Sequence, residues 1–352
     1  MNKIDRRRFG KTLGALCAGL ALPAWAAPTF GNAGTRRLIK PPRLRAGALI
    51  GLVAPSGVEN DAGIEAGVRN LESLGFKVKL GKNIRAVRGG YAGTVAERVE
   101  DLHAMFHDRE VQAIWAARGG SGASALLPHL DYALMRRIPK ILIGYSDITA
   151  LHLAIHRRAG LVTFHGPVAS STFNDYTVNH MLSVLMEPQR EYAIHQSIEN
   201  ERKAVEQPQF AMRTIRAGVA RGRLVGGNLS LVAALAGTPY AADIRGGLLF
   251  LEEVDEEPYR VDRMLTQLQQ NHPFGSVAGA MLGVFQKGAA KGGNRQLTMG
   301  EVLDDNFAAL KIPSVYGYSF GHIPHQMTLP VGVRAELNTA EQTLTLLESA
   351  VL

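Results

Sequence analysis

The sequence predicts an α/β fold: an N-terminal Rossmann-like domain with a doubly wound parallel sheet, followed by a C-terminal mixed α+β domain. The first half of the chain alternates short apolar strands with segments of helical spacing, and repeated β-α units of this size favour a parallel sheet. Residues 187–212 are polar, have little periodicity and predict an interdomain linker. Beyond them the regular alternation ends, so a domain of a different kind is expected.

The N-terminal domain is expected over residues 45–186. Apolar or alternating runs predict its strands at 48–54, 76–80, 111–117, 141–145 and 161–164. Helical spacing predicts helices over 62–74 and 94–108 and a third that begins at Ile148. Ligands of doubly wound sheets bind beyond the carboxyl ends of the strands, where Gly119-Gly120 and Ser146 both fall.

The C-terminal domain is expected over residues 213–352. Its predicted strands are 219–225, 247–252 and 278–286, with a hairpin formed by 334–337 and 343–346. Its predicted helices are 228–236, 259–270 and 298–310. Strands and helices of this mixture fit a mixed α+β domain.

The N-terminus has the pattern of an export signal. Arg6-Arg7-Arg8 precede an apolar stretch over residues 13–22, and Ala24-Trp25-Ala26 fits a small-residue cleavage site. Paired arginines predict a twin-arginine signal, with an ordinary Sec signal as the alternative. The sequence therefore predicts cleavage of residues 1–26 and a periplasmic protein.

Composition excludes several functions for the mature chain. The only cysteine, Cys17, lies in the predicted signal, so neither a disulfide nor a thiol nucleophile is expected. Half of the formal charge of +8 also comes from residues 1–26. The remaining modest excess, without basic runs interleaved with aromatic residues, does not indicate nucleic-acid binding. No second apolar stretch is long enough to span a membrane.

A candidate nucleophile lies in the segment 141–150, which is predicted to be a buried strand, a tight turn and a helix start. Ser146 lies on this turn, and the N–H of Asp147 after it could face a developing oxyanion. The structural alternative is that Ser146 only caps the helix, because serine is a common N-cap residue.

Two other motifs indicate competing chemistry. Gly120, Gly122 and Ala125 fit the spacing of a dinucleotide-binding loop with Asp147 as its acid, but the loop follows the third strand instead of the first. His152 and His156 have the spacing of zinc ligands on a helix, yet the glutamate that a metallopeptidase needs between them is absent. We expect neither a cofactor nor a metal.

A buried acid and a histidine could complete a serine site. Glu252 ends a very apolar predicted strand and should be partly buried, unless Glu253 is the inward residue; a buried carboxylate needs a partner. His322 and His325 follow another apolar strand, and either could be a base or an ordinary loop histidine. Serine, acid and base would then follow one another along the chain, but the order varies among triads and spacing alone does not select these three residues.

Nearly the whole mature chain resembles the LD-carboxypeptidase family of serine peptidases, which includes muramoyltetrapeptide carboxypeptidases and microcin C self-immunity peptidases. The motifs that carry the resemblance are V-A-P-S-G at 53–57, R-G-G at 118–120, G-Y-S-D-I-T-A at 144–150, G-G-N-L at 226–229, L-E-E-V-D-E-E-P-Y-R-V-D-R at 251–263, and G-H at 321–322 followed by T-L-P-V-G at 328–332. One departure is Ser121, where family members often have an aromatic residue.

The resemblance implies that Ser146 is the nucleophile, Glu252 the acid and His322 the base of a triad. It also implies an oxyanion hole from backbone N–H groups at Gly120 and Asp147, a murein peptide as substrate with D-alanine released, and a homodimer. Two alternatives are a related peptidase that cleaves a peptide-nucleotide or another acyl conjugate, and an inactive murein-binding envelope protein. A nicotinamide oxidoreductase is a more distant one.

Overall fold

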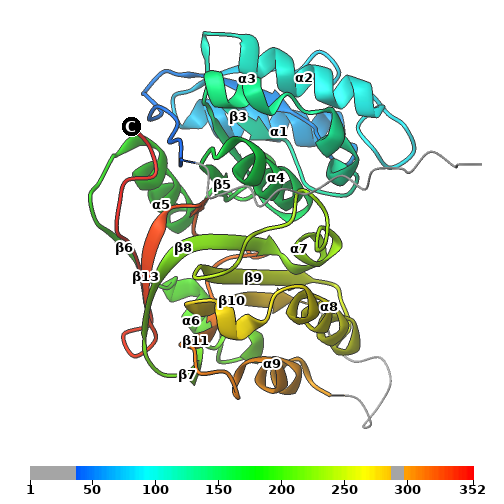
Figure 1. The fold of residues 1–352 in the computed structure, drawn as a ribbon. Coiled ribbons are helices and arrows are strands. Elements are labelled where there is room, and N and C mark those ends of the chain that lie inside the picture. The colour runs from blue at the N-terminus through cyan, green and yellow to red at the C-terminus, as the bar shows by residue number, and fades with distance from the viewer. Residues whose placement is uncertain (1–36, 287–296) are drawn as a thin grey trace, which may run out of the picture. The chain divides into compact units, whose positions relative to one another are not determined.

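The computed structural model describes residues 37–286 and 297–352, which form two sheets with helices (Figure 1). The predicted export signal, residues 1–26, lies outside the described part of the chain. Within that part, no helix is long and apolar enough to cross a membrane.

The first sheet has six strands in the order β12-β5-β4-β3-β1-β2. Its parallel strands are β1 (Leu49–Val53), β2 (Lys77–Leu80), β3 (Val111–Ala116), β4 (Ile141–Gly144) and β5 (Thr163–His165). The five predicted strands of this domain are confirmed. The edge strand β12 (Leu329–Val331) pairs antiparallel with β5 and comes from the range predicted for the other domain.

Helices cover both faces of this sheet, as the doubly wound prediction requires. One face packs against α1 (Asp61–Ser73) and α5 (Asp175–Met186), through Ile64 and Met181 among others. The other face packs against α2 (Val95–His107), α3 (Tyr132–Arg137), α4 (Thr149–Ala159) and the 3₁₀ helix η1 (Ala123–His129). Thr94 begins α2 with a capping box to Glu97, which fixes the start that the sequence predicts.

The second sheet has eight strands in the order β6-β14-β13-β8-β9-β10-β11-β7. Four central strands run parallel: β8 (Val219–Asn228), β9 (Leu248–Val254), β10 (Gly279–Gln286) and β11 (Ser314–Tyr318). The antiparallel strands are β13 (Arg334–Asn338), β14 (Thr343–Leu346), β6 (Tyr192–Ile194) and β7 (Arg213–Arg216). The predicted hairpin of β13 and β14 and the mixed character of this domain are confirmed.

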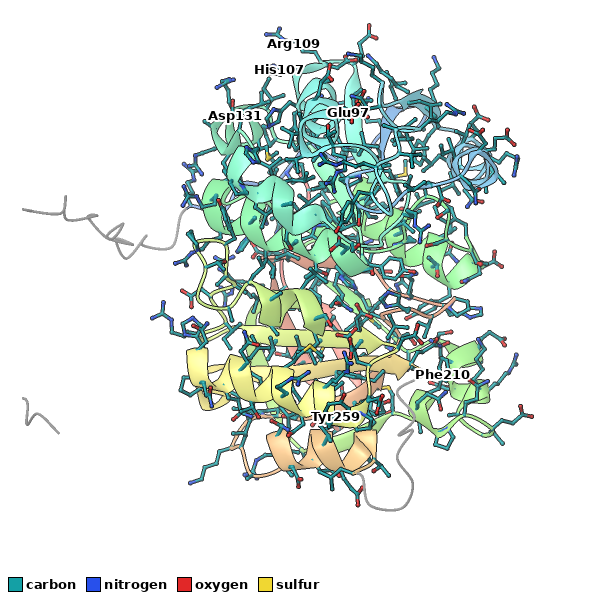
Figure 2. The ribbon with its side chains drawn as sticks, turned by 90° about the vertical axis from the view of Figure 1, so that its right-hand side faces the viewer. Glu97, His107, Arg109, Asp131, Phe210 and Tyr259 are labelled. Carbon is teal, nitrogen blue, oxygen red and sulfur yellow. The ribbon has the colours of Figure 1, made fainter. Side chains whose placement is uncertain are left out.

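Three helices lie along one face of the second sheet: α7 (Leu229–Ala234), α8 (Pro258–Asn271) and α9 (Met299–Phe307). Figure 2 shows Tyr259 of α8 among the elements of this sheet and Glu97 of α2 among those of the other. One continuous apolar cluster joins the two sets of helices, and α4 contacts α7 within it. The two sheets therefore share a core, which holds their strand ends in fixed positions.

The range predicted as a linker, 187–212, has regular structure of its own. It contains β6, which pairs with β14, then α6 (Ile198–Lys203) and the 3₁₀ turn η3 (Pro208–Phe210). Polar residues here make specific contacts: the side-chain amide of Asn200, which is fully buried, donates to Ser319 Oγ and to the carbonyl of His325. A polar composition alone does not distinguish such a segment from a flexible linker.

Candidate active site

Ser146 lies on a turn at the carboxyl end of β4, and its own backbone has an unusual conformation. The strand ends at Gly144, and the short 3₁₀ helix η2 (Ser146–Ile148) leads into α4. Ser146 has φ +64°, a left-handed conformation that non-glycine residues adopt rarely and often at functional sites. Its hydroxyl caps neither η2 nor α4. The alternative that Ser146 is only a helix cap is therefore wrong.

A hydrogen-bonded chain joins Ser146, His322 and Glu252. The Nε2 atom of His322 lies 3.0 Å from Ser146 Oγ, and its Nδ1 atom lies 2.7 Å from Glu252 Oε2. A carboxylate can only accept, so Nδ1–H donates to Glu252 and Nε2 accepts from the serine hydroxyl. The structure thus brings together three residues that lie 70 and 176 positions apart along the chain.

The elements around Glu252 and His322 explain how the two residues meet. Glu252 lies near the end of the parallel strand β9, between the buried residues Leu251 and Glu253. The exposed fraction of its own side chain is 0%. His322 follows β11, which ends at Tyr318. Gly321 before it has φ +112°, and a Cβ there would lie 2.9 Å from Glu252 Oε2. Only glycine lets the chain pass this close to the carboxylate.

The environment shifts both pKa values toward a charged pair. Burial by itself lowers the pKa of His322, but the charge and hydrogen bond of Glu252 outweigh it and raise this pKa above its usual value. Burial likewise favours a higher pKa for Glu252, whereas the charge of His322 and its hydrogen bond lower it below the usual range. The ring of Tyr145 meets the imidazole edge-on, with ring centres 4.9 Å apart, and helps to fix its orientation.

Glu253, the other candidate for the inward carboxylate, is also buried but faces other partners. It accepts hydrogen bonds from the side-chain amide of Asn228 and from the backbone and hydroxyl of Ser230. Burial raises its pKa. The sequence did not indicate a function for Asn228, although the residue lies in a motif shared with the family.

The glycine turn after β3 packs directly against Ser146. A Cβ on Gly119 would lie 2.8 Å from Ser146 Cβ and 3.1 Å from its Oγ. Gly120 has φ +123°, and a Cβ there would lie 2.9 Å from the backbone of Gly57. Among the described residues, the N–H groups of Gly120 and Asp147 have no hydrogen-bond acceptor. The turn therefore has the close approach and the free donors that an oxyanion site needs.

Two side chains near this turn, those of Tyr91 and Arg98, were not expected from the sequence. Ser121, at the position where family members often have an aromatic residue, is exposed. The ring of Tyr91 lies against Gly122 instead, 2.7 Å from where a Cβ of Gly122 would be. The guanidinium of Arg98 lies over the same ring, 5.3 Å from its centre. Tyr91 thus places an aromatic surface beside the turn from a different segment of the chain.

The competing motifs are used differently. Asp147, the acid of the possible dinucleotide loop, accepts hydrogen bonds from Ser56 and from the N–H of Ala123. His152 is fully buried, and its Nε2 atom forms a hydrogen bond with the carbonyl of Gly144. Burial lowers the pKa of His152 to about 3 and the pKa of His156 to about 4. His325 lies outside the Ser146 chain of hydrogen bonds. Residues 37–286 and 297–352 contain no group of three or more metal-ligating side chains.

A serine, a histidine and a buried carboxylate in one hydrogen-bonded chain, beside free backbone donors, is the arrangement of a serine hydrolase. Comparison with known proteins defines the class further. Residues 50–166 match the LD-carboxypeptidase N-terminal domain, and residues 221–337 match the LD-carboxypeptidase C-terminal domain.

Individual relatives agree with these matches. A "Probable murein peptide carboxypeptidase" of Bacillus subtilis (strain 168) is 38% identical over 86% of this chain and 93% of its own length. The crystal structure of a muramoyltetrapeptide carboxypeptidase from Oxalobacter formigenes superposes with a TM-score of 0.73 at 30% identity, over 85% and 98% of the two chains. A structure of the microcin C7 self-immunity protein MccF in complex with aspartyl sulfamoyl adenosine reaches 0.79 at 26% identity, over 89% and 100%.

The chain belongs to the LD-carboxypeptidase family and is a serine-type carboxypeptidase.

Proposed function

We propose that this enzyme is an LD-carboxypeptidase that hydrolyses the amide between an L-centre and a C-terminal D-amino acid, releasing D-alanine from murein tetrapeptides. The observation that carries the proposal is the hydrogen-bonded chain from Ser146 through His322 to Glu252. The names of the relatives supply the substrate class: the protein from Pseudomonas aeruginosa, 32% identical over 82% of this chain and 92% of its own length, is a murein tetrapeptide carboxypeptidase.

The chemistry follows from the positions of the three side chains. His322 Nε2 accepts the proton of Ser146 Oγ as the oxygen attacks the carbonyl carbon of the scissile amide. The N–H groups of Gly120 and Asp147 would bind the oxygen that becomes negative. The imidazolium then gives its proton to the leaving nitrogen of the D-amino acid, and the acyl group stays on Ser146. Water, deprotonated by His322, hydrolyses this ester and regenerates the serine.

Glu252 has a different part in this reaction. Its carboxylate accepts from Nδ1–H, so it holds the imidazole in the tautomer that leaves Nε2 free, and its charge stabilises the imidazolium that forms. Complete burial keeps water from competing for this bond.

We also propose that the enzyme acts in the periplasm after export through residues 1–26, and that it is a homodimer. The arginine cluster and the small-residue cleavage site support export, and the family resemblance supports the dimer. The periplasm is where murein and its turnover fragments are available.

The direct test is incubation of the purified mature protein with disaccharide tetrapeptide, followed by measurement of free D-alanine. Ser146→Ala should lower turnover by a factor on the order of 10³ or more and leave the fold intact, as judged by circular dichroism. A variant with near-normal turnover would refute the role of Ser146.

A second candidate substrate is a peptide-nucleotide or a similar acyl conjugate. It is favoured by the structural similarity to MccF, whose structure holds an aspartyl sulfamoyl adenosine. A panel that compares murein tetrapeptide with aminoacyl conjugates of adenosine separates the two: the preferred class is the one with the higher kcat/KM.

A further inference from the structure

The carboxylate of Asp147 links the ends of three parallel strands. Asp147 follows Ser146 after β4, and its Oδ2 atom accepts from Ser56 Oγ at 2.5 Å and from the N–H of Ala123 at 2.8 Å. Ser56 follows β1, and Ala123 ends the glycine turn that follows β3. One oxygen atom therefore connects the turn that carries Ser146 to the segments that follow β3 and β1, the next two strands of the sheet.

Arg98, on α2, connects two of these three strand ends. Its Nη1 atom donates to the carbonyl of Pro55 at 3.2 Å and to the carbonyl of Gly122 at 3.1 Å. Its side chain is buried, which lowers its pKa, and the negative charge of Asp147 opposes that effect. Arg98 therefore joins the segments that follow β1 and β3 through two carbonyl groups, and its positive charge lies near the carboxylate of Asp147.

The residues held by this link are under conformational constraint. Ser146 has φ +64° and Gly120 has φ +123°. The N–H of Gly57 donates to the carbonyl of Gly119 at 3.2 Å, so the glycine turn is anchored from the β1 side as well. Strained backbone persists only where the surrounding structure holds it.

The side chains that form this link are buried, so they act on the reaction indirectly, through the residues that they hold. Ser56 is 0% exposed and Asp147 is 4% exposed, so neither side chain can contact a substrate that approaches Ser146. The two N–H groups proposed to bind the oxyanion belong to Gly120, in the turn, and to Asp147 itself. The distance between these two N–H groups depends on the hydrogen bonds that hold the glycine turn against the turn that carries Ser146.

We propose that Asp147, through its side-chain bonds to Ser56 and Ala123 and with Arg98 beside it, is a positioning residue that holds the two oxyanion donors in their working geometry. This inference rests on the proposed function, since it assigns a cause to the transition-state stabilisation of that reaction. It concerns the side chain of Asp147, whereas the oxyanion hole uses only its backbone.

Asp147→Ala and Asp147→Asn test the proposal as a pair. The alanine variant removes the acceptor, and the rate at which a fluorophosphonate probe labels Ser146 should fall by about 10²-fold, the typical cost of losing one oxyanion donor. The asparagine variant keeps an amide oxygen that can accept from both Ser56 and Ala123, so it should recover most of the labelling rate. With murein tetrapeptide, kcat of the alanine variant should fall by about the same factor while KM changes little.

Asp131→Ala is the matched structural control. Asp131 also accepts a backbone N–H, that of Leu134 at 2.8 Å, but it caps α3 and does not contact the glycine turn. Its removal should lower the melting temperature and leave the labelling rate unchanged. Should the labelling rate simply follow melting temperature across the Asp131 and Asp147 variants, the role of Asp147 is merely structural and the proposal is wrong.

Other outcomes also decide the matter. A folded Asp147→Ala enzyme that labels at the wild-type rate overturns the proposal, as does an Asp147→Asn enzyme that is as slow as the alanine variant. Where Asp147→Ala does not fold, Ser56→Ala breaks one of the two bonds and should lower the labelling rate and kcat without raising KM. Because the probe reports Ser146 without murein, a wild-type enzyme that is labelled but releases no D-alanine refutes only the murein substrate.

Discussion

Replacing Glu252 by glutamine should slow the reaction and shift its pH dependence, two effects that arise from one pair of atoms. Glu252 Oε2 and His322 Nδ1 are 2.7 Å apart, and the carboxylate is fully buried. Two unit charges about 4 Å apart at an effective dielectric constant of about 20 interact by about 4 kcal/mol. Glutamine removes this stabilisation of the imidazolium, so kcat should fall by about 10³-fold.

The pH profile separates this cause from general damage. His322 must be neutral to accept the serine proton, so wild-type kcat/KM falls as the pH decreases through the pKa of His322, which Glu252 raises. Without the charge of Glu252, burial dominates and the pKa of His322 drops. The acid limb of the Glu252→Gln profile should therefore lie at lower pH than that of the wild type.

The assay is D-alanine release from murein tetrapeptide between pH 4 and 9. Glu253→Gln is the matched control, because Glu253 is a neighbouring buried carboxylate that bonds to Asn228 and Ser230 and not to His322. It should retain kcat within about tenfold and nearly the same acid limb. A Glu252→Gln enzyme whose acid limb does not move would contradict the assigned role of the Glu252 charge.

Three further predictions concern the glycine turn, the predicted linker and acid stability. Gly119→Ala puts a Cβ 2.8 Å from the Cβ of Ser146 and should lower kcat by at least about 10²-fold. Gly90→Ala is the control, because a Cβ at Gly90 would have open space around it and should leave kcat unchanged. Equal kcat values for the two variants would disprove the close approach of Gly119 to Ser146. Asn200→Ala should lower the free energy of unfolding by about 1–3 kcal/mol, because it leaves the carbonyl of His325 without a donor and removes one of the two donors to Ser319 Oγ. An unchanged urea midpoint would contradict this. Burial lowers the pKa values of three histidines, to about 3 for His152 and to about 4 for His156 and His165. Below about pH 6.5 the unfolded chain therefore binds more protons than the folded protein. The free energy of unfolding should be about 2 kcal/mol smaller per histidine at pH 5 than at pH 7. Urea titrations at the two pH values test this, and equal stabilities would show that these imidazoles are not held neutral.

Regular local patterns made much of the fold predictable. The strands of the first sheet are apolar because helices cover both faces, so β1, β3 and β4 stand out from the chain around them. Helices with strong start signals were also found, such as α2 with Thr94 as its cap. By contrast, α5 was missed, although Asn174 accepts from the N–H of Thr177 and marks its start. Strand β12 has only three residues, too few for a pattern, and its place is decided by pairing with β5.

The candidate site shows where sequence reasoning reaches its limit. Residue types and local context made Ser146, Glu252 and His322 candidates, but local pattern alone could not choose between His322 and His325 or between Glu252 and Glu253. Family resemblance made that choice, and the structure places the chosen three within hydrogen-bond distance. The roles of Ser56, Arg98 and Tyr91 had no local signal, because their partners come from other strand ends.

The sequence by itself determined the α/β class, most of the helices and strands, and the family. It did so because periodicity and motif order are local properties that survive without coordinates. Only the tertiary structure decided which carboxylate meets which imidazole, that Ser146 is no helix cap, and that the polar range 187–212 packs against the loop that carries His322. These are contacts between residues far apart in the chain, and they depend on how the parallel strand ends converge.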